Sequence, residues 1–294
     1  MSAGVDKLEL LTRRIEKPFL NLAREEGSQR SGYKNVIDLR QTRYKLPVIL
    51  HCDGWHGGIH KIQLIGVARL GLRRARRLLG TILGDLSFVR IYRIDLCTDI
   101  PGIYVGDLAE TVLVSRVQNF RIYKKRGGLS FYLQNSANKT ILIYDKLKQL
   151  AATKNPRATA YGPGERLTRI EVQLKGSAVP FKKLRHLRRY ADVDLLENLE
   201  FRTLKNMTSG EKPLHRLASA GLRQSISQIG LHATKKKFAS SEWAYLERLF
   251  LEEMGNSEEV LDIRSRLKRS IEDWLENRIR FPRYRNVNAS DGRD

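Results

Sequence analysis

The chain has only two cysteines, Cys52 and Cys97, among its 294 residues. They are too few and too far apart for a disulfide framework or a cysteine-rich zinc site, so we interpret both as reduced thiols in the core. No apolar run approaches the roughly 18 residues that a membrane-spanning helix needs, and the first residues (MSAGVDKLELLTRR) have no apolar signal-peptide core. These absences predict a cytoplasmic protein that has no membrane partner.

Acidic residues are scarce relative to basic ones. The chain carries 54 lysines and arginines against 32 aspartates and glutamates, a formal net charge of +22. A positive charge of this size favours a polyanionic partner, with nucleic acid ahead of an anionic membrane surface. The sequence also lacks the Gly-x₄-Gly-Lys-Ser/Thr loop with which many nucleotide hydrolases hold phosphates.

Strand-like patterns dominate the first 178 residues, and the turns between them favour an antiparallel sheet. We expect strands at Pro47–Cys52, Ile59–Gly66, Phe88–Asp99, Val117–Tyr123, Leu129–Gln134, Thr140–Tyr144 and Leu167–Lys175. Residues 1–35 are polar and predict only weak helix, whereas Val67–Leu83 has the apolar spacing of an amphipathic helix. The sequence therefore predicts an α+β fold, an antiparallel β-sheet with flanking helices.

Helical patterns replace the strands after residue 178. The predicted helices are Phe181–Tyr190, Glu211–Ile229, Ser240–Met254 and Glu258–Ile279, followed by a frayed basic tail from Arg280. A chain of this length can form one large domain or two modest ones. We expect a strand-rich domain over residues 1–178 and a helical C-terminal region over residues 179–294.

Three carboxylates lie on predicted strands, where acids are scarce because burying an unpaired carboxylate is costly. Uninterrupted alternation along one predicted strand places Asp95 and Asp99 on the same face as Ile91 and Arg93. Glu171 shares a face of another strand with Arg169. If the two strands are neighbours, the carboxylates converge, and such oxygen ligands suit Mg²⁺ or Mn²⁺. The alternative is structural, because arginines on the same face can form ion pairs with these carboxylates.

A tyrosine and a lysine end the run Ile141–Lys146 (ILIYDK). The run begins as an apolar strand and gives way to a helix-like segment, which can hold the hydroxyl of Tyr144 toward a ligand. Lys146 lies two residues further on, close enough to stabilise a phenolate or to bind a phosphate. The alternative is a tyrosine packed on the rim of the sheet beside a solvated lysine.

Three short motifs together resemble rolling-circle replication initiators, the replication initiation factors of small plasmids and the gene II type of filamentous phages. The motifs are Arg93-Ile94-Asp95, Tyr144-Asp145-Lys146 and Arg169-Ile170-Glu171, in the order that the family has. The resemblance covers about residues 45–205. It implies a nickase-like sheet core in the strand-rich domain, with Tyr144 as the nucleophile and Lys146 at the scissile phosphate. Asp95 and Glu171, with Asp99 as a third ligand, would hold Mg²⁺ or Mn²⁺.

The activity that this resemblance implies is the nicking of one DNA strand through a 5′-phosphotyrosine, followed later by rejoining. The partner would be DNA at a replication origin, single-stranded or cruciform, and a host helicase, a polymerase and a second copy of the chain are further candidates. Two features depart from the family and its wider class. Gln149 stands where the plasmid proteins usually have Glu, with Asp145 as a candidate substitute, and the His-hydrophobic-His motif of other nickases is missing.

Basic residues in four places are candidates for contacts with DNA phosphates. They are Arg93, Arg169, the helix residues Arg73, Arg74, Arg76 and Arg77, and the later residues Lys182, Lys183, Arg185, Arg188 and Arg189. A solvated surface is the alternative for the two basic segments. For the whole chain, the alternatives are a non-catalytic DNA-binding protein, such as a repressor, and a tyrosine nuclease or recombinase that needs no metal. A tyrosine recombinase needs an Arg/His/Arg set in a helical catalytic domain. Tyr144 lies at the edge of predicted strands, which disfavours the recombinase hypothesis.

Overall fold

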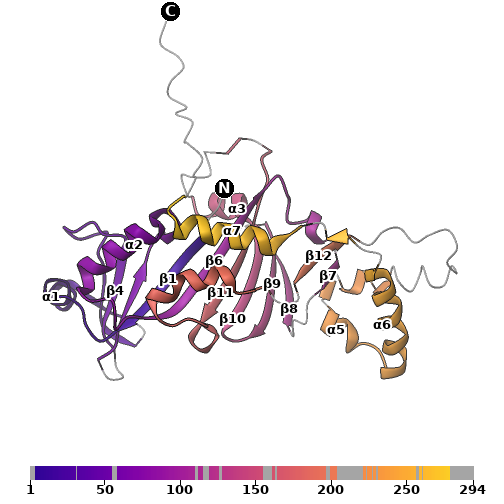
Figure 1. Ribbon diagram of the computed structural model, residues 1–294, viewed down its shortest axis with the longest axis horizontal. Coiled ribbons are helices and arrows are strands. Elements are labelled where there is room, and N and C mark those ends of the chain that lie inside the picture. The colour runs from indigo at the N-terminus through magenta and orange to yellow at the C-terminus, as the bar shows by residue number, and fades with distance from the viewer. Residues whose placement is uncertain are drawn as a thin grey trace, which may run out of the picture.

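The fold, seen in a computed structural model, is α+β, with helices packed on a large antiparallel sheet (Figure 1). The structure describes residues 4–30, 32–54, 58–109, 112–114, 119–125, 128–154, 161–162, 164–196, 199–203, 221–222, 224–226, 228–229, 231–255, 258–259 and 261–278. Most of the predicted helix Glu211–Ile229 and the whole tail from Arg280 lie outside this part.

Ten strands form the main sheet in the order β2-β3-β4-β5-β1-β6-β11-β10-β9-β8, and all neighbours are antiparallel. Their bounds are β1 Gly4–Thr12, β2 Ser28–Arg30, β3 Tyr33–Asp38, β4 Val48–Gly54, β5 His60–Leu64, β6 Arg90–Pro101, β8 Asn119–Lys125, β9 Gly128–Ser136, β10 Lys139–Asp145 and β11 Leu167–Lys175. A three-stranded sheet joins β13 (Glu258–Glu259), β12 (Glu200–Thr203) and β7 (Val112–Val114) in that order.

Helices cover one face of the main sheet, where Figure 1 shows α2 and α7 lying across the strands. The α-helices are α1 Lys17–Glu26, α2 Val67–Leu83, α3 Lys146–Ala152, α5 Leu231–Lys235, α6 Ser240–Gly255 and α7 Ile263–Leu275. Short 3₁₀ helices are η1 Asp107–Ala109, η3 Gly176–Ala178 and η4 Leu184–Asp192. None of the helices in these described ranges combines the length and the apolar character needed to cross a bilayer.

The core lies between the helices and the apolar face of the sheet. Leu8, Leu10, Ile94 and Leu96 are buried there by period-2 alternation. Two hydrogen bonds of 2.9 Å hold α7 in place. Trp274 Nε1 donates to the carbonyl oxygen of Val67 at the start of α2, and Ser270 Oγ donates to Thr98 Oγ1 of β6. Because Thr98 faces the helices, its neighbours in the strand, Cys97 and Asp99, face the other side of the sheet.

The strand predictions between residues 47 and 175 are confirmed. Leu167–Lys175 forms β11 with unchanged bounds, β4 and β5 pair as the expected antiparallel neighbours, and β8, β9 and β10 form the expected meander. The amphipathic helix Val67–Leu83 is α2, also with unchanged bounds. Apart from β6, which contains a bulge, the strands keep a regular apolar spacing. Helix α2 is kinked at Gly71, whose φ is +65°.

The prediction for residues 1–35 is wrong, because β1 is a central strand and only α1 is helical there. A β-bulge explains the error. Val5 pairs with Leu96 and Lys7 pairs with Asp95, so Asp6 is an extra residue in β1. The buried residues Val5 and Leu8 are therefore three positions apart, which imitates a helical period.

A second bulge corrects the predicted faces of β6. Leu8 pairs with Ile94 and Leu10 pairs with Ile91, which leaves Tyr92 as the extra residue. Ile91 therefore lies in the core, on the face opposite to that of Arg93, and not beside it as uninterrupted alternation predicted.

Two helix predictions after residue 178 also change. The segment predicted as one helix from Glu258 contains β13, and α7 begins only at Ile263 because Asp262 caps it, accepting a hydrogen bond from the Ser265 backbone N–H at 3.0 Å. The basic segment that begins at Phe181 forms the 3₁₀ helix η4. Helices η4 and α7 contribute to the same core as β1 and β6, and the division into two domains stays a prediction.

Gly4 gives a test of how α7 docks. Its φ is +64°, and a Cβ built there would meet the Trp274 Cβ and lie 2.6 Å from the Ser270 carbonyl oxygen. Gly4→Ala should therefore lower the free energy of unfolding by about 3 kcal/mol or more, from strain and overpacking together. Gly102 is the matched control, since its φ is +80° but nothing lies within 4 Å of the added atom. Gly102→Ala should cost only about 1–2 kcal/mol of strain. Equal losses in urea unfolding would contradict the packing of Gly4 against α7.

Candidate active site

The three motifs found in the sequence lie on three neighbouring strands, β6, β11 and β10, with Lys146 just beyond the end of β10 at the start of α3. Arg169 in β11 stands opposite Asp99 of β6 on one side and opposite Tyr144 of β10 on the other. Glu171 stands opposite Cys97 on β6. The pairing therefore brings the predicted nucleophile and the predicted carboxylates to one face of the sheet, the face that α2 and α7 do not cover.

The hydroxyl of Tyr144 donates a hydrogen bond to Glu171 Oε2 at 2.9 Å. The other carboxylate oxygen of Glu171 accepts from Gln173 Nε2 at 2.7 Å, which fixes the orientation of the carboxylate. Burial raises the pKa of Tyr144 well above its ordinary value, and the charge of Glu171 adds to the rise while Arg169 opposes it. The phenol is thus neutral and has a carboxylate in position to take its proton.

Arg169 is buried and ties three strands together. Its Nε and Nη2 donate to the two carboxylate oxygens of Asp99 at 2.6 and 2.8 Å, and its Nη1 donates to Asp6 Oδ1 at 2.7 Å. The sequence pattern placed Arg169 and Glu171 on one face and left cross-strand ion pairs as an alternative. The pairing of β11 with β6 gives Arg169 the cross-strand partner Asp99. Sequence reasoning missed Asp6, which the bulge in β1 turns toward this cluster.

Asp95 is buried beside Arg93, whose Nε and Nη2 donate to its two oxygens at 2.8 Å each. Burial raises the pKa of Asp95 to about 6; Arg93 opposes this rise, and the charge of Glu171 adds to it. Asp95 and Glu171 therefore lie near enough to repel each other across the strand pair.

The predicted metal ligands do not fit a three-carboxylate site in this arrangement. Within the described ranges, no three His, Cys, Asp or Glu side chains form a group that could hold a metal ion. Asp95 and Asp99 each face an arginine, and Glu171 faces the donors of Tyr144 and Gln173. The requirement for Mg²⁺ or Mn²⁺ stays a prediction.

Lys146 lies against the tyrosine at the start of α3. Its Nζ is 5.6 Å from the centre of the Tyr144 ring and donates to Gln149 Oε1 at 2.7 Å. Burial lowers the pKa of Lys146, and the positive charge of Arg169 adds to the decrease. Asp145 is the N-cap of α3, and its carboxylate accepts a hydrogen bond from the Lys148 backbone N–H at 2.9 Å. This carboxylate therefore caps the helix.

The predicted phosphate-binding residues divide between the two faces of the sheet. Arg93 and Arg169 belong to the ion pairs around the tyrosine. The others are exposed on the helical side: Arg73, Arg74, Arg76 and Arg77 in α2, and Lys182, Lys183, Arg185, Arg188 and Arg189 in and beside η4.

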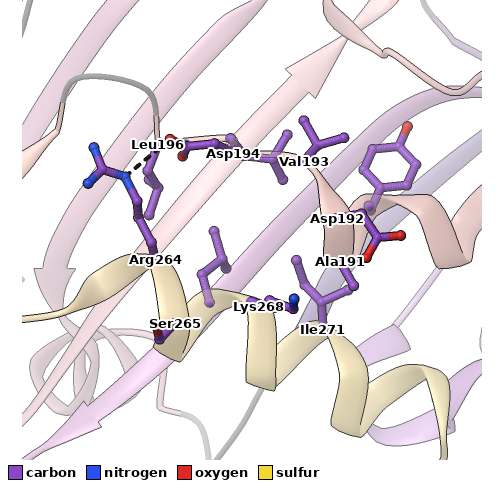
Figure 2. A pocket seen from close by; sticks show the side chains of 12 residues that line it. Ala191, Asp192, Val193, Asp194, Leu196, Arg264, Ser265, Lys268 and Ile271 are labelled. Carbon is purple, nitrogen blue, oxygen red and sulfur yellow. Dashed lines mark hydrogen bonds and ion pairs between the residues drawn. The ribbon is translucent and has the colours of Figure 1, made fainter.

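A pocket of about 240 Å³ between η4 and α7 contains none of the predicted residues. Figure 2 shows its lining, in which Leu196 and Ile271 are apolar and an ion pair joins Arg264 Nε to Asp194 Oδ2 at 3.2 Å. The lining contains both acidic and basic residues, whereas a site that binds a polyanion is expected to be mainly basic.

The raised pKa of Asp95 predicts a pH-dependent stability. Because the folded protein keeps the Asp95 proton to higher pH than the unfolded chain, the wild type loses stability as pH rises from about 4 to about 6. Asp95→Asn lacks this titration, so the variant should gain about 1–3 kcal/mol relative to the wild type between pH 4 and pH 8. Chemical unfolding at several pH values, in a chelator, measures the difference. A difference that is constant with pH would contradict the raised pKa.

The chain matches no known family model and no curated protein. We therefore infer its function from the chemistry that Tyr144, Glu171 and Lys146 can perform together.

Proposed function

We propose that the protein cleaves one strand of DNA with Tyr144 as the nucleophile and so initiates rolling-circle replication. The hydrogen bond from the Tyr144 hydroxyl to Glu171 carries this proposal. A phenol is a weak nucleophile at neutral pH, and a base within hydrogen-bond reach is the usual means of activating such a group. The order of the three motifs and the net charge of +22 also support it.

The cleavage step transfers a phosphoryl group from one oxygen to another. The Tyr144 oxygen attacks the scissile phosphorus while its proton passes to Glu171. The bond from phosphorus to the 3′-oxygen breaks, and the departing 3′-oxygen takes a proton to become a 3′-hydroxyl. The product is a 5′-phosphotyrosyl bond, and the reverse reaction with a 3′-hydroxyl rejoins the strand. No oxidant, reductant or nucleotide is consumed.

Lys146 and Arg169 assist the step in different ways. The ammonium of Lys146 adjoins the tyrosine ring, where it can bind a phosphate oxygen and offset the charge that develops on it. Its lowered pKa also makes it a stronger acid, suited to protonating the 3′-oxygen. Arg169 is held by Asp99 and Asp6 and acts by positioning β11 and lowering the cost of negative charge at the tyrosine.

A divalent ion would stabilise the charge on the phosphate if one binds during the reaction. The steps above are assigned to residues of this chain, and the requirement for Mg²⁺ or Mn²⁺ stays a prediction.

A non-catalytic DNA-binding protein is the second candidate. The ion pairs Arg93–Asp95 and Arg169–Asp99 favour it, because they are what carboxylates with a purely structural role would form. For this candidate, the hydrogen bond between Tyr144 and Glu171 only pairs two polar groups on the sheet. The two functions therefore differ in whether a covalent adduct forms.

Tyr144→Phe is the direct test. The change removes one oxygen, so the protein should stay folded with a loss of about 1–2 kcal/mol and should bind DNA as the wild type does. The covalent adduct with a single-stranded origin oligonucleotide, assayed with Mg²⁺ or Mn²⁺, should disappear. Mass spectrometry of the wild-type adduct should place the nucleotide on Tyr144. Nicking without an adduct would mean that water is the nucleophile, and an adduct on Tyr132 would move the site.

Glu171→Gln tests the proton acceptor. The adduct should form at least about 100-fold more slowly at neutral pH, and its rate should rise with pH as hydroxide replaces the lost base. Asp95→Asn is the matched control, because it removes a neighbouring carboxylate that does not touch the tyrosine. If both variants lose activity equally and excess Mn²⁺ restores both, the two residues are metal ligands and Glu171 is not the base.

A further inference from the structure

The two basic segments that are far apart in the sequence meet in space. A pocket of about 150 Å³ lies between them, lined by Arg76 of α2, by Leu86 and Ser87 after α2, and by Lys183, Leu184 and Arg185 at the start of η4. Backbone pairing holds the second segment in place, because the Ile91 N–H donates to the Lys182 carbonyl oxygen at 2.7 Å and Arg90 forms a β-bridge with Lys183. One wall of the pocket is therefore formed by a segment whose backbone is hydrogen-bonded to the start of β6.

The charge of this pocket is strongly positive. Three of its six lining residues are cations, and none of the three forms an ion pair with a carboxylate of the described chain. The nearest acid in sequence is Asp85, which accepts hydrogen bonds from the Ser87 backbone N–H and Oγ at 2.8 and 2.6 Å. Asp85 is not among the residues that line the pocket, so the lining keeps an excess of positive charge and would attract an anion.

This pocket lies on the helical side of the sheet, away from Tyr144. Leu184 of η4 and Leu79 of α2 are buried in the core that fills the apolar face. On β10, Ile143 points into that core, so Tyr144 and its hydrogen bond to Glu171 lie on the opposite face. A DNA segment in contact with the pocket is therefore separated from the tyrosine by the thickness of the sheet.

We propose that the pocket between α2 and η4 binds the phosphates of duplex DNA as a second nucleic-acid site. The neighbouring exposed cations extend the charge beyond the pocket, along α2 through Arg73 and Arg77 and along η4 through Arg188. A free phosphate would leave these cations without a partner, whereas a duplex backbone presents a regular series of charges to them. That the duplex is held while a single strand reacts on the other face rests on the proposed nicking function.

The test uses the full chain with Arg76, Lys183 and Arg185 all changed to Gln. In the Tyr144→Phe background, affinity for a 20-base-pair duplex should fall at least about 30-fold, and the log–log salt slope should fall by about 2–3. The control changes Lys235, Lys236 and Lys237 to Gln, which removes the same charge at another exposed place. The control should lose less than about 3-fold in duplex affinity.

A second measurement separates this inference from the nicking function. The pocket variant with Tyr144 intact should form as much adduct with a short single-stranded oligonucleotide as the wild type does. Equal loss of duplex binding by the pocket variant and the control would overturn the inference, as would a pocket variant that loses binding only to phosphatidylserine vesicles. If the wild type forms no adduct but the pocket variant loses duplex binding, the proposed function fails and the second site stands.

Discussion

The antiparallel pairing of β11 between β6 and β10 is the constraint on which the rest of the site depends. It places Arg169 opposite both Asp99 and Tyr144, and it lets the tyrosine hydroxyl reach Glu171. A shift of one residue in this register would turn Glu171 into the core and bring Ile170 to the polar face. The apolar residues that alternate with the site residues prevent such a shift, so the core and the site specify each other.

Sequence patterns predicted most of the sheet, because strands without irregularities keep a period of two. Both bulges broke that period, which is why β1 was missed and Ile91 was assigned to the wrong face. The partners of the charged residues were harder to predict. Arg169 binds Asp99 and Asp6, which lie 70 and 163 positions away, and only the order of the strands determines that choice. The proximity of Tyr144, Lys146 and Gln149 was local and could be anticipated from their spacing.

The two faces of the sheet contribute differently to the stability of the fold. The helical face buries Leu8, Leu79, Ile94 and Trp274 and supplies the favourable free energy of folding. The other face buries charged groups whose desolvation works against folding, most clearly at Asp95 with its raised pKa. Hydrogen bonds to nearly every buried carboxylate oxygen limit that cost, because a buried polar network is tolerated only when its members are paired.

The strand order also has a consequence for how the protein folds. β6 and β11 are neighbours in space, yet the meander of β8, β9 and β10 lies between them in the sequence. β1 likewise pairs with β6 across β2 to β5 and α2. Contacts of such high sequence separation slow folding, since the entropy of closing the intervening loops is lost before the contacts form. During synthesis, Tyr144 emerges before Glu171, which accepts its hydrogen bond in the folded protein. The tyrosine hydroxyl therefore lacks this partner until β11 has been made and has inserted between its two neighbours.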